Sequence, residues 1–231
     1  MRHAAFFGQT FSTQGTPTGL PEPVAIINFI LPIDTNSVNM LLGAVNGQVR
    51  NGVKKITIVI SSPGGDTTAA FAAYNILKNV QAEITTFNAG NIDSAAMLIY
   101  CAGKHRYSFP DPARFLIHGN AMTLGTGVPM DYTFLDAQLH QIQSLNQMVA
   151  QVISSVTNKK KESEIETAIH GQTILSPEQA KEWGIVQEIR TNFMVPGAVF
   201  VSVNTPVPVQ DKKPIEYSTL QPAVSAGQPK Q

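Results

Sequence analysis

Apolar and polar positions change their period along this chain, and the changes predict strands and helices in alternation. Residues 55–60 form a near-continuous β-branched run, which is typical of a strand buried on both faces. Further strands are predicted at 24–31, 82–87, 105–109, 114–118 and 185–189. Helical spacing predicts a helix that begins at Asp34 or Thr35, and others at 67–80, 94–102, 131–156, 163–170 and 176–183.

Strands that alternate with helices predict an α/β fold with a mostly parallel sheet covered on both sides. The pattern is absent before residue 23 and dissolves after residue 190. We therefore expect a flexible arm at 1–22, one domain at 23–190 and a mostly disordered C-terminal extension at 191–231.

Composition narrows the function. The chain has 231 residues, of which 43% are hydrophobic and 14% are charged, so one sizeable core is expected. The scarcity of charged residues favours an oligomer with surface buried between subunits. The formal net charge is zero, which argues against nucleic acid as a partner. The histidines lack metal-ligand spacing, so no metal is expected.

The compartment is predicted from what the sequence contains. Cys101 is the single cysteine, which excludes an intrachain disulfide and suits a reducing compartment. We expect it to be a buried, inert thiol. No segment resembles a signal peptide or a membrane-spanning helix, so a soluble, cytoplasmic protein without a membrane partner is predicted.

Three segments carry candidate chemistry. Ser94 opens an all-apolar helix, and His118 ends an all-apolar strand. Gly64 and Gly65 follow another apolar strand. A nucleophile, a base and a turn of backbone amides are the parts that serine acyl transfer needs.

Two backbone amides are candidates for stabilising an oxyanion. The amide of Ala95 lies at a helix N-terminus, where N–H groups are unpaired and carry partial positive charge. Gly65 can turn a second amide inward, because glycine adopts backbone angles that other residues avoid. One such donor lowers the barrier by roughly 3–4 kcal/mol. Each feature alone also has a structural reading, as a helix cap, a packed histidine or a tight turn.

Four segments together resemble the proteolytic subunit of the Clp protease, ClpP. They are residues 61–65 (SSPGG), 90–94 (GNIDS), 115–118 (FLIH) and 174–186 (ILSPEQAKEWGIV). The resemblance runs from about residue 26 to 189 and keeps the family's order and approximate spacing. It implies a ClpP/crotonase-like fold of repeated β-β-α units, with a mostly parallel sheet, a long handle helix at 131–156 and disordered termini.

The resemblance also implies roles for single residues. Ser94 corresponds to the nucleophile and His118 to the general base, and the amides of Gly65 and Ala95 correspond to the oxyanion hole. Gln172 stands at the position of the family's triad aspartate, four residues before the serine of the final Leu-Ser motif. An amide oxygen can accept a hydrogen bond but cannot compensate an imidazolium charge.

Two further points concern carboxylates. Asp93 stands before the serine, where the family has a small residue. Either its negative charge disfavours an oxyanion nearby, or its carboxylate points away from the site. Glu166 and Asp111 are the other carboxylates that sequence proximity suggests for the third position.

The resemblance predicts a serine endopeptidase that cleaves through an acyl-enzyme and needs no cofactor. It implies a ring oligomer, commonly a heptamer or a double heptamer, stacked through the long helix. Peptides or unfolded proteins are the implied substrates, and an ATP-driven AAA+ unfoldase is the partner implied for many members.

Three alternatives remain open at this point. One is a catalytically weak or inactive ring subunit with a structural role, which Gln172 and Asp93 motivate. A second is an acyl-CoA enzyme of the crotonase type, which explains the glycine turns but not the pair of Ser94 and His118. A third, a membrane signal-peptide peptidase with a serine–lysine dyad, is disfavoured because the sequence contains no anchor segment.

Overall fold

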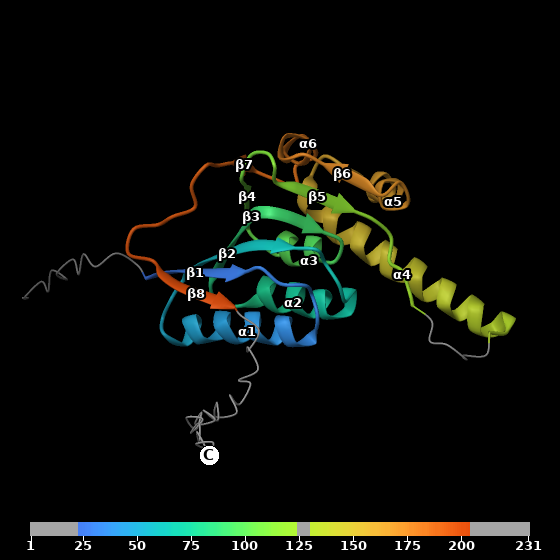
Figure 1. The fold of residues 1–231 in the computed structure, drawn as a ribbon, viewed down its shortest axis with the longest axis horizontal. Helices are drawn as coiled ribbons and strands as arrows, with labels where there is room; N and C mark the ends of the chain where they lie inside the picture. Colours follow the sequence, from blue (N-terminus) through green and yellow to red (C-terminus); the bar gives the residue numbers. More distant parts are fainter. Residues whose placement is uncertain (1–22, 124–129, 204–231) are drawn as a thin grey trace, which may run out of the picture.

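The computed structural model describes residues 23–123 and 130–203, which form one α/β domain (Figure 1). Its strands are β1 (Val24–Phe29), β2 (Lys55–Ser62), β3 (Glu83–Asp93), β4 (His105–Ser108), β5 (Arg114–Ile117), β6 (Thr173–Leu175), β7 (Glu188–Ile189) and β8 (Val199–Val203). Its helices are α1 (Thr35–Arg50), α2 (Thr67–Asn79), α3 (Ala96–Cys101), α4 (Tyr132–Thr157), α5 (Glu162–His170) and α6 (Pro177–Trp183).

The strands form one eight-stranded sheet in the order β6-β5-β3-β2-β1-β8, and β4 pairs with both β3 and β7. Every pairing is parallel except that of β5 with β6. The predicted mostly parallel α/β sheet is therefore confirmed.

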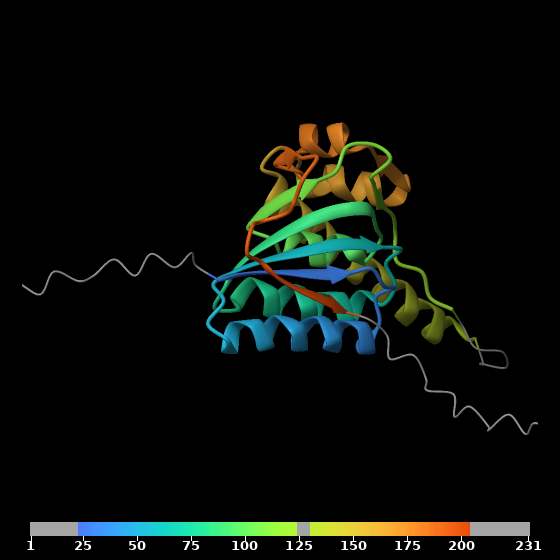
Figure 2. The same cartoon turned by 60° about the vertical axis from the view of Figure 1, so that its left-hand side comes forward.

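Helices α1, α2 and α3 pack against one face of the sheet, where they bury the main core (Figure 1). The opposite face carries a smaller cluster of Ile26, Val59 and Phe87. Phe193 packs on this cluster, with its ring 5.4 Å from that of Phe87. The segment that leads into β8 crosses this second face (Figure 2).

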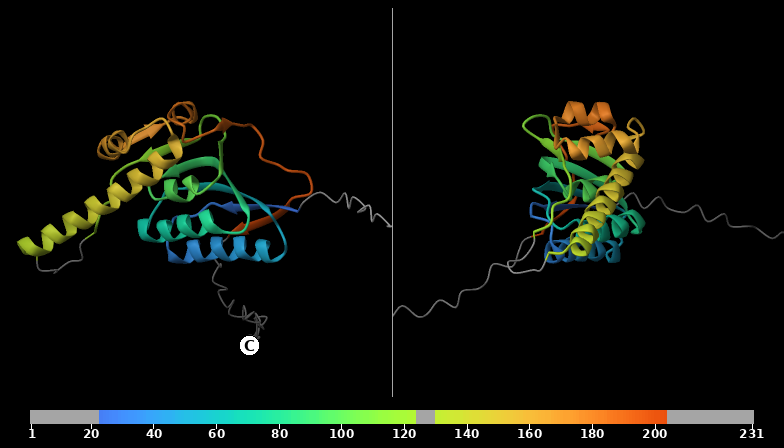
Figure 3. Two further views of the ribbon diagram at one scale, coloured as in Figure 1. Left: turned by 180° about the vertical axis from the view of Figure 1, so that it is seen from behind. Right: turned by 90° about the vertical axis from the view of Figure 1, so that its right-hand side faces the viewer.

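Helix α4 runs out from the body of the domain, so its first turns lie away from the sheet (Figure 3). This is the predicted long helix, and it begins at the cap residue Asp131, whose side chain accepts from the amide of Phe134 at 2.8 Å. No helix in residues 23–123 or 130–203 is long and apolar enough to cross a membrane.

Short polar residues set the helix starts as the sequence predicts. Asp34 caps α1 in a capping box with Ser37. Ser176 caps α6, with Pro177 at the first helical position. Gly184 ends α6 with φ +83°, and a Cβ there would lie 2.1 Å from the carbonyl oxygen of Thr157.

Three elements differ most from the sequence expectation. The third strand continues to Asp93, because polar side chains in its second half find partners on neighbouring strands; Asn88, for example, donates to the carbonyl of Arg114 at 3.0 Å. Neither β6 nor β8 was predicted; β6 pairs antiparallel with β5, and β8 pairs in parallel with β1. The expectations for residues 1–22 and 204–231 lie outside the described residues.

The topology brings three strand ends together. β2 and β5 both pair in parallel with β3, so their carboxyl ends meet at one edge of the sheet. Residues 64–65 follow β2, Ser94 follows β3 and His118 follows β5. Ligand sites of parallel sheets lie at this edge, and the three predicted segments meet there.

Candidate active site

Ser94 lies at a sharp turn between β3 and α3. Its φ is +58°, in the left-handed region that non-glycine residues rarely adopt. Its amide donates to the carbonyl of Leu116 at 2.9 Å, which fixes the turn against β5. The N-cap of α3 is Ala95, and it makes no side-chain cap bond. The Ser94 hydroxyl is thus not used as a helix cap, and among the described residues it has no hydrogen-bond partner.

The glycine pair lies directly against this turn. Gly64 has φ +83°, and a Cβ there would lie 2.5 Å from Cβ of Ser94 and 2.6 Å from the carbonyl oxygen of Asp93. Gly65 has φ +144°, and a Cβ there would lie 2.1 Å from the carbonyl oxygen of Ile33. Both positions therefore need glycine for space as well as for conformation.

Two amides are available at this turn. In the described part of the chain, the N–H groups of Gly65 and Ala95 have no backbone acceptor. The position that a Cβ of Gly64 would take lies 3.1 Å from the nitrogen of Ala95, so the glycine turn and the start of α3 are in contact. The arrangement is compatible with two donors to one oxyanion.

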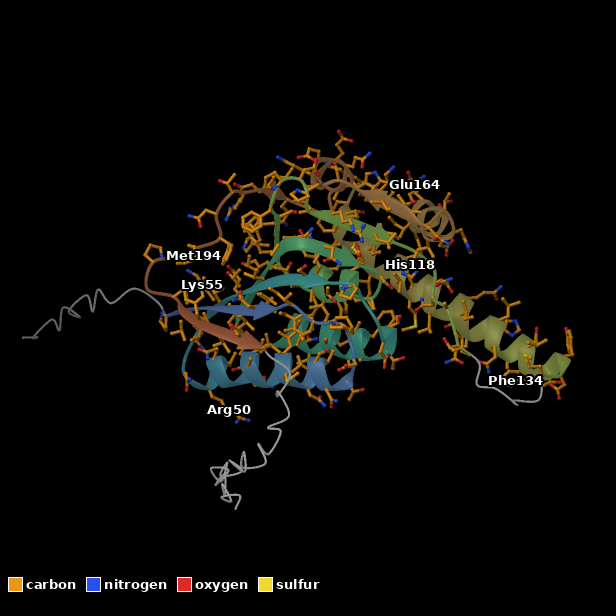
Figure 4. The ribbon with its side chains drawn as sticks, viewed as in Figure 1. Arg50, Lys55, His118, Phe134, Glu164 and Met194 are labelled. Atoms are coloured by element: carbon orange, nitrogen blue, oxygen red, sulfur yellow. The ribbon has the colours of Figure 1, made fainter. Side chains whose placement is uncertain are left out.

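His118 is half-buried at the end of β5, beside α4 (Figure 4). Its Nδ1 lies 2.8 Å from the carbonyl oxygen of Gly119. Because a carbonyl only accepts, this contact requires the hydrogen on Nδ1 and leaves Nε2 free to accept a proton. Among the described residues, no carboxylate is hydrogen-bonded to His118.

The position of Gln172 follows from the strand register. Ile117 of β5 pairs with Thr173 of β6 in an antiparallel ladder, so the next positions along the two strands are those of His118 and Gln172. Gln172 is exposed and has φ +49°. The sequence-predicted third position therefore lies next to His118, although the Gln172 side chain makes no hydrogen bond to it.

One narrow cavity contains both predicted catalytic side chains. It has a volume of about 10 Å³, which is room for roughly one water molecule. Ser94 and His118 both line it, without a direct hydrogen bond between them. The other lining residues are Thr67, Ala95, Met97, Ile117, Asn120, Val149 and Ile153.

Sequence reasoning missed a polar framework beside this cavity. Thr67 at the start of α2 donates to Oδ1 of Asn120 at 2.5 Å. The Asn120 backbone and side-chain N–H groups both donate to Oδ1 of Asn146 on α4, at 2.8 and 2.9 Å. No spacing in the sequence relates these residues, because they come from three separate elements. The framework ties the loop after His118 to two helices.

The remaining carboxylates do not complete a triad in the described structure. Asp93 is directed to Arg114, whose guanidinium lies 2.8 Å from Oδ2. Asp111 is exposed in the turn before β5. Glu166 lines a separate cavity of about 500 Å³ between α4 and α5. Neither Asp111 nor Glu166 is hydrogen-bonded to His118.

Cys101 has no part in this chemistry. It is fully buried at the end of α3, and burial raises the pKa of its thiol to about 12. A thiol with such a pKa carries almost no thiolate near neutral pH. The prediction that this thiol is buried is therefore confirmed.

Comparisons with known proteins agree on one family. The family model described as Clp protease matches residues 25–193. The chain is 31% identical over 138 residues to the ATP-dependent Clp protease proteolytic subunit 2 of Corynebacterium jeikeium. This match covers 59% of this chain and 64% of that relative. It is also 31% identical over 137 residues to the subunit of the same name from Frankia casuarinae, covering 59% and 61%.

A solved structure shows the same fold. A mutant of ClpP1 from Listeria monocytogenes superposes with a TM-score of 0.65 at 22% sequence identity, covering 72% of this chain and 91% of that one. The chain matches less than two thirds of the length of the curated relatives. The fold and the family are shown by these matches.

Proposed function

Because this chain belongs to the Clp protease family, we propose that it is a serine endopeptidase that cleaves peptides through an acyl-enzyme. The observation that carries the proposal is the meeting of three strand ends at one edge of the sheet. There a serine hydroxyl without a hydrogen-bond partner, a histidine whose Nδ1 contacts the Gly119 carbonyl and two amides without backbone acceptors lie close together. The names of the relatives support the same activity.

In the proposed mechanism, Oγ of Ser94 attacks the peptide carbonyl while Nε2 of His118 takes its proton. The amides of Gly65 and Ala95 donate to the resulting oxyanion. His118 then returns the proton to the leaving amine as the C–N bond breaks. A water molecule, deprotonated by the same nitrogen, releases the acyl group and restores the serine.

In this proposal, the carbonyl of Gly119 has one of the two roles of a triad carboxylate, which is to orient the histidine. By accepting from Nδ1–H, it fixes the tautomer and the ring orientation of His118. A neutral carbonyl does not compensate the imidazolium charge as a carboxylate does. We therefore expect an enzyme with a slower turnover than one that has the full triad.

The second candidate is a ring subunit with little or no catalysis. It is favoured by the exposed Gln172 at the third position and by the missing hydrogen bond between Ser94 and His118. Hydrogen bonds between catalytic groups are often formed only in the substrate complex, so this second observation does not exclude activity.

A serine-directed fluorophosphonate probe separates the two candidates. We expect stoichiometric labelling of the wild type and none of Ser94→Ala. Ser155→Ala, which removes an exposed hydroxyl on α4, is the matched control and should label like the wild type. Cleavage of a panel of short fluorogenic peptides should follow the same order. A wild type that labels no faster than Ser94→Ala would exclude the peptidase.

We also propose that the chain works as an oligomeric ring, with an ATP-driven unfoldase as partner. The exposed apolar side chains on α4 support an interface: Tyr132 is 83%, Leu135 49% and Leu139 52% exposed. The relatives are named as subunits of an ATP-dependent protease. Light scattering should give a mass several times 24.9 kDa, and Leu135→Glu with Leu139→Glu should reduce it.

A further inference from the structure

A buried carboxylate beside the candidate nucleophile joins two of the strands that form the site. Asp93 is 5% exposed and immediately precedes Ser94. Its Oδ2 accepts from the guanidinium of Arg114 at 2.8 Å and from Nδ2 of Asn91 at 3.0 Å. Arg114 belongs to β5, the strand that His118 follows. One carboxylate oxygen therefore connects the strand of the nucleophile to the strand of the base.

Asn91 extends this connection to a third strand. Its Oδ1 accepts from the hydroxyl of Ser61 at 2.8 Å, and its Nδ2 also donates to the carbonyl of Ser62 at 3.0 Å. Both serines end β2, which leads into the turn at residues 64–65. The side chains of Asp93, Arg114, Asn91 and Ser61, here called the Asp93 network, thus join β2, β3 and β5, the three strands whose ends meet at the candidate site.

The contribution of Asp93 to folding does not account for this arrangement. Its Oδ1 is buried and is the one buried side-chain polar atom without a hydrogen-bond partner in the described residues. Arg114 is half exposed, so the ion pair is partly screened by water. Burying a carboxylate with one oxygen unsatisfied is unfavourable. Groups of this kind are found where a function requires them.

We propose that Asp93 is a positioning residue, which holds the Ser94 turn, the glycine turn and the base strand at fixed separations. The proposal rests on the peptidase function proposed above. The left-handed backbone of Ser94 needs restraint from its surroundings. Displacing a reacting group by 1 Å costs about 100-fold in rate. Arg114 also offsets the negative charge that would otherwise lie unpaired beside the oxyanion.

Peptidase kinetics per active site test the proposal, with active sites counted by fluorophosphonate labelling. Asp93→Ala and Arg114→Met should each lower kcat by about 10- to 100-fold and leave KM within about twofold. Asp93→Asn, which keeps the shape but loses the charge, should lie between them and the wild type. The double variant should be no slower than the slower single variant, because both remove one coupled interaction.

The control lies on the same strand. Glu83, the first residue of β3, forms an exposed ion pair with Lys104, so Glu83→Gln should keep kcat within about twofold. Hydrogen exchange gives a readout independent of turnover. The amide of Ser94, bonded to Leu116, should exchange at least about tenfold faster in Asp93→Ala, while the amides that pair β1 with β8 should be unchanged.

The outcomes separate this inference from the proposed function. If the wild type shows no labelling that depends on Ser94, the peptidase function fails and this inference fails with it. If the wild type reacts, but Asp93→Ala has an unchanged kcat per labelled site and unchanged exchange at Ser94, the inference alone is overturned. A loss of kcat that follows a fall in the denaturation midpoint, with uniform exchange, would assign Asp93 a structural role and also overturn it.

Discussion

The two halves of the candidate site differ in how many contacts hold their residues in place. The nucleophile half, formed by the glycine turn and Ser94, is fixed by close backbone contacts and by the Asp93 network. In the base half, formed by His118 and the position of Gln172, the His118 side chain has a single hydrogen bond among the described residues, to the carbonyl of the adjacent Gly119. At Gly64 and Gly65 a side chain would meet backbone atoms within 3 Å, whereas Gln172 is exposed and its side chain makes no hydrogen bond. We therefore expect substitutions in the nucleophile half to lower the rate of the proposed peptidase, and a carboxylate in the base half to raise it.

The largest predicted effect concerns the contact between Gly64 and the nucleophile. Gly64→Ala places a Cβ 2.5 Å from Cβ of Ser94 at a φ of +83°, so the turn must move. We expect fluorophosphonate labelling to fall by more than about 100-fold. Gly43→Ala is the control, since a Cβ at that exposed position of α1 meets nothing within 4 Å. It should label normally and stabilise the fold by about 0.5–1 kcal/mol.

A smaller effect, of opposite sign, is predicted in the base half. Gln172→Asp introduces a carboxylate at the position that the strand register brings beside His118. Because a carboxylate compensates the imidazolium charge, peptide cleavage should rise by about tenfold. Gln141→Asp, at an exposed position on α4, should leave the rate unchanged. An unchanged rate in Gln172→Asp would contradict our account of the base half and leave the Gly119 carbonyl as the sufficient orienting group.

The nucleophile half was also the more predictable from the sequence. Glycine at 64 and 65 after a β-branched strand, and a serine before an apolar helix, each carry a local signal. The parallel topology then brings them together. Helix caps at Asp34 and Ser176 were predicted for the same reason, because their partners lie within three residues.

Most of the contacts that sequence reasoning missed join residues far apart in the chain. Thr67, Asn120 and Asn146 meet only after the helices have packed. The hydrogen bond from His118 to the Gly119 carbonyl depends on backbone angles that no sequence pattern fixes. The direction of Asp93 was left open in the sequence, because it depends on Arg114 lying diagonally opposite across the β3–β5 pair. β8 was not predicted for a similar reason, because its pairing depends on the free edge of β1.

The smallest predicted effect concerns fold stability and the exposed ion pair of Glu83 with Lys104 at the start of β3. At the start of this strand, the hydrogen bond from Lys104 lowers the pKa of Glu83 below its usual 4.5. A carboxyl whose pKa is lower in the folded than in the unfolded chain stabilises the fold at pH values above 4.5. This stabilisation is lost as the pH falls below 4.5 through the pKa of the folded state. In urea denaturation, Glu83→Gln should therefore reduce the free energy of unfolding by less than about 1 kcal/mol at pH 7, and the difference should narrow towards pH 4. A difference that is equal at both pH values would show that packing, and not charge, gives this pair its effect. The Glu83–Lys104 pair would then not serve as a charge control for the ion pair of Asp93 with Arg114.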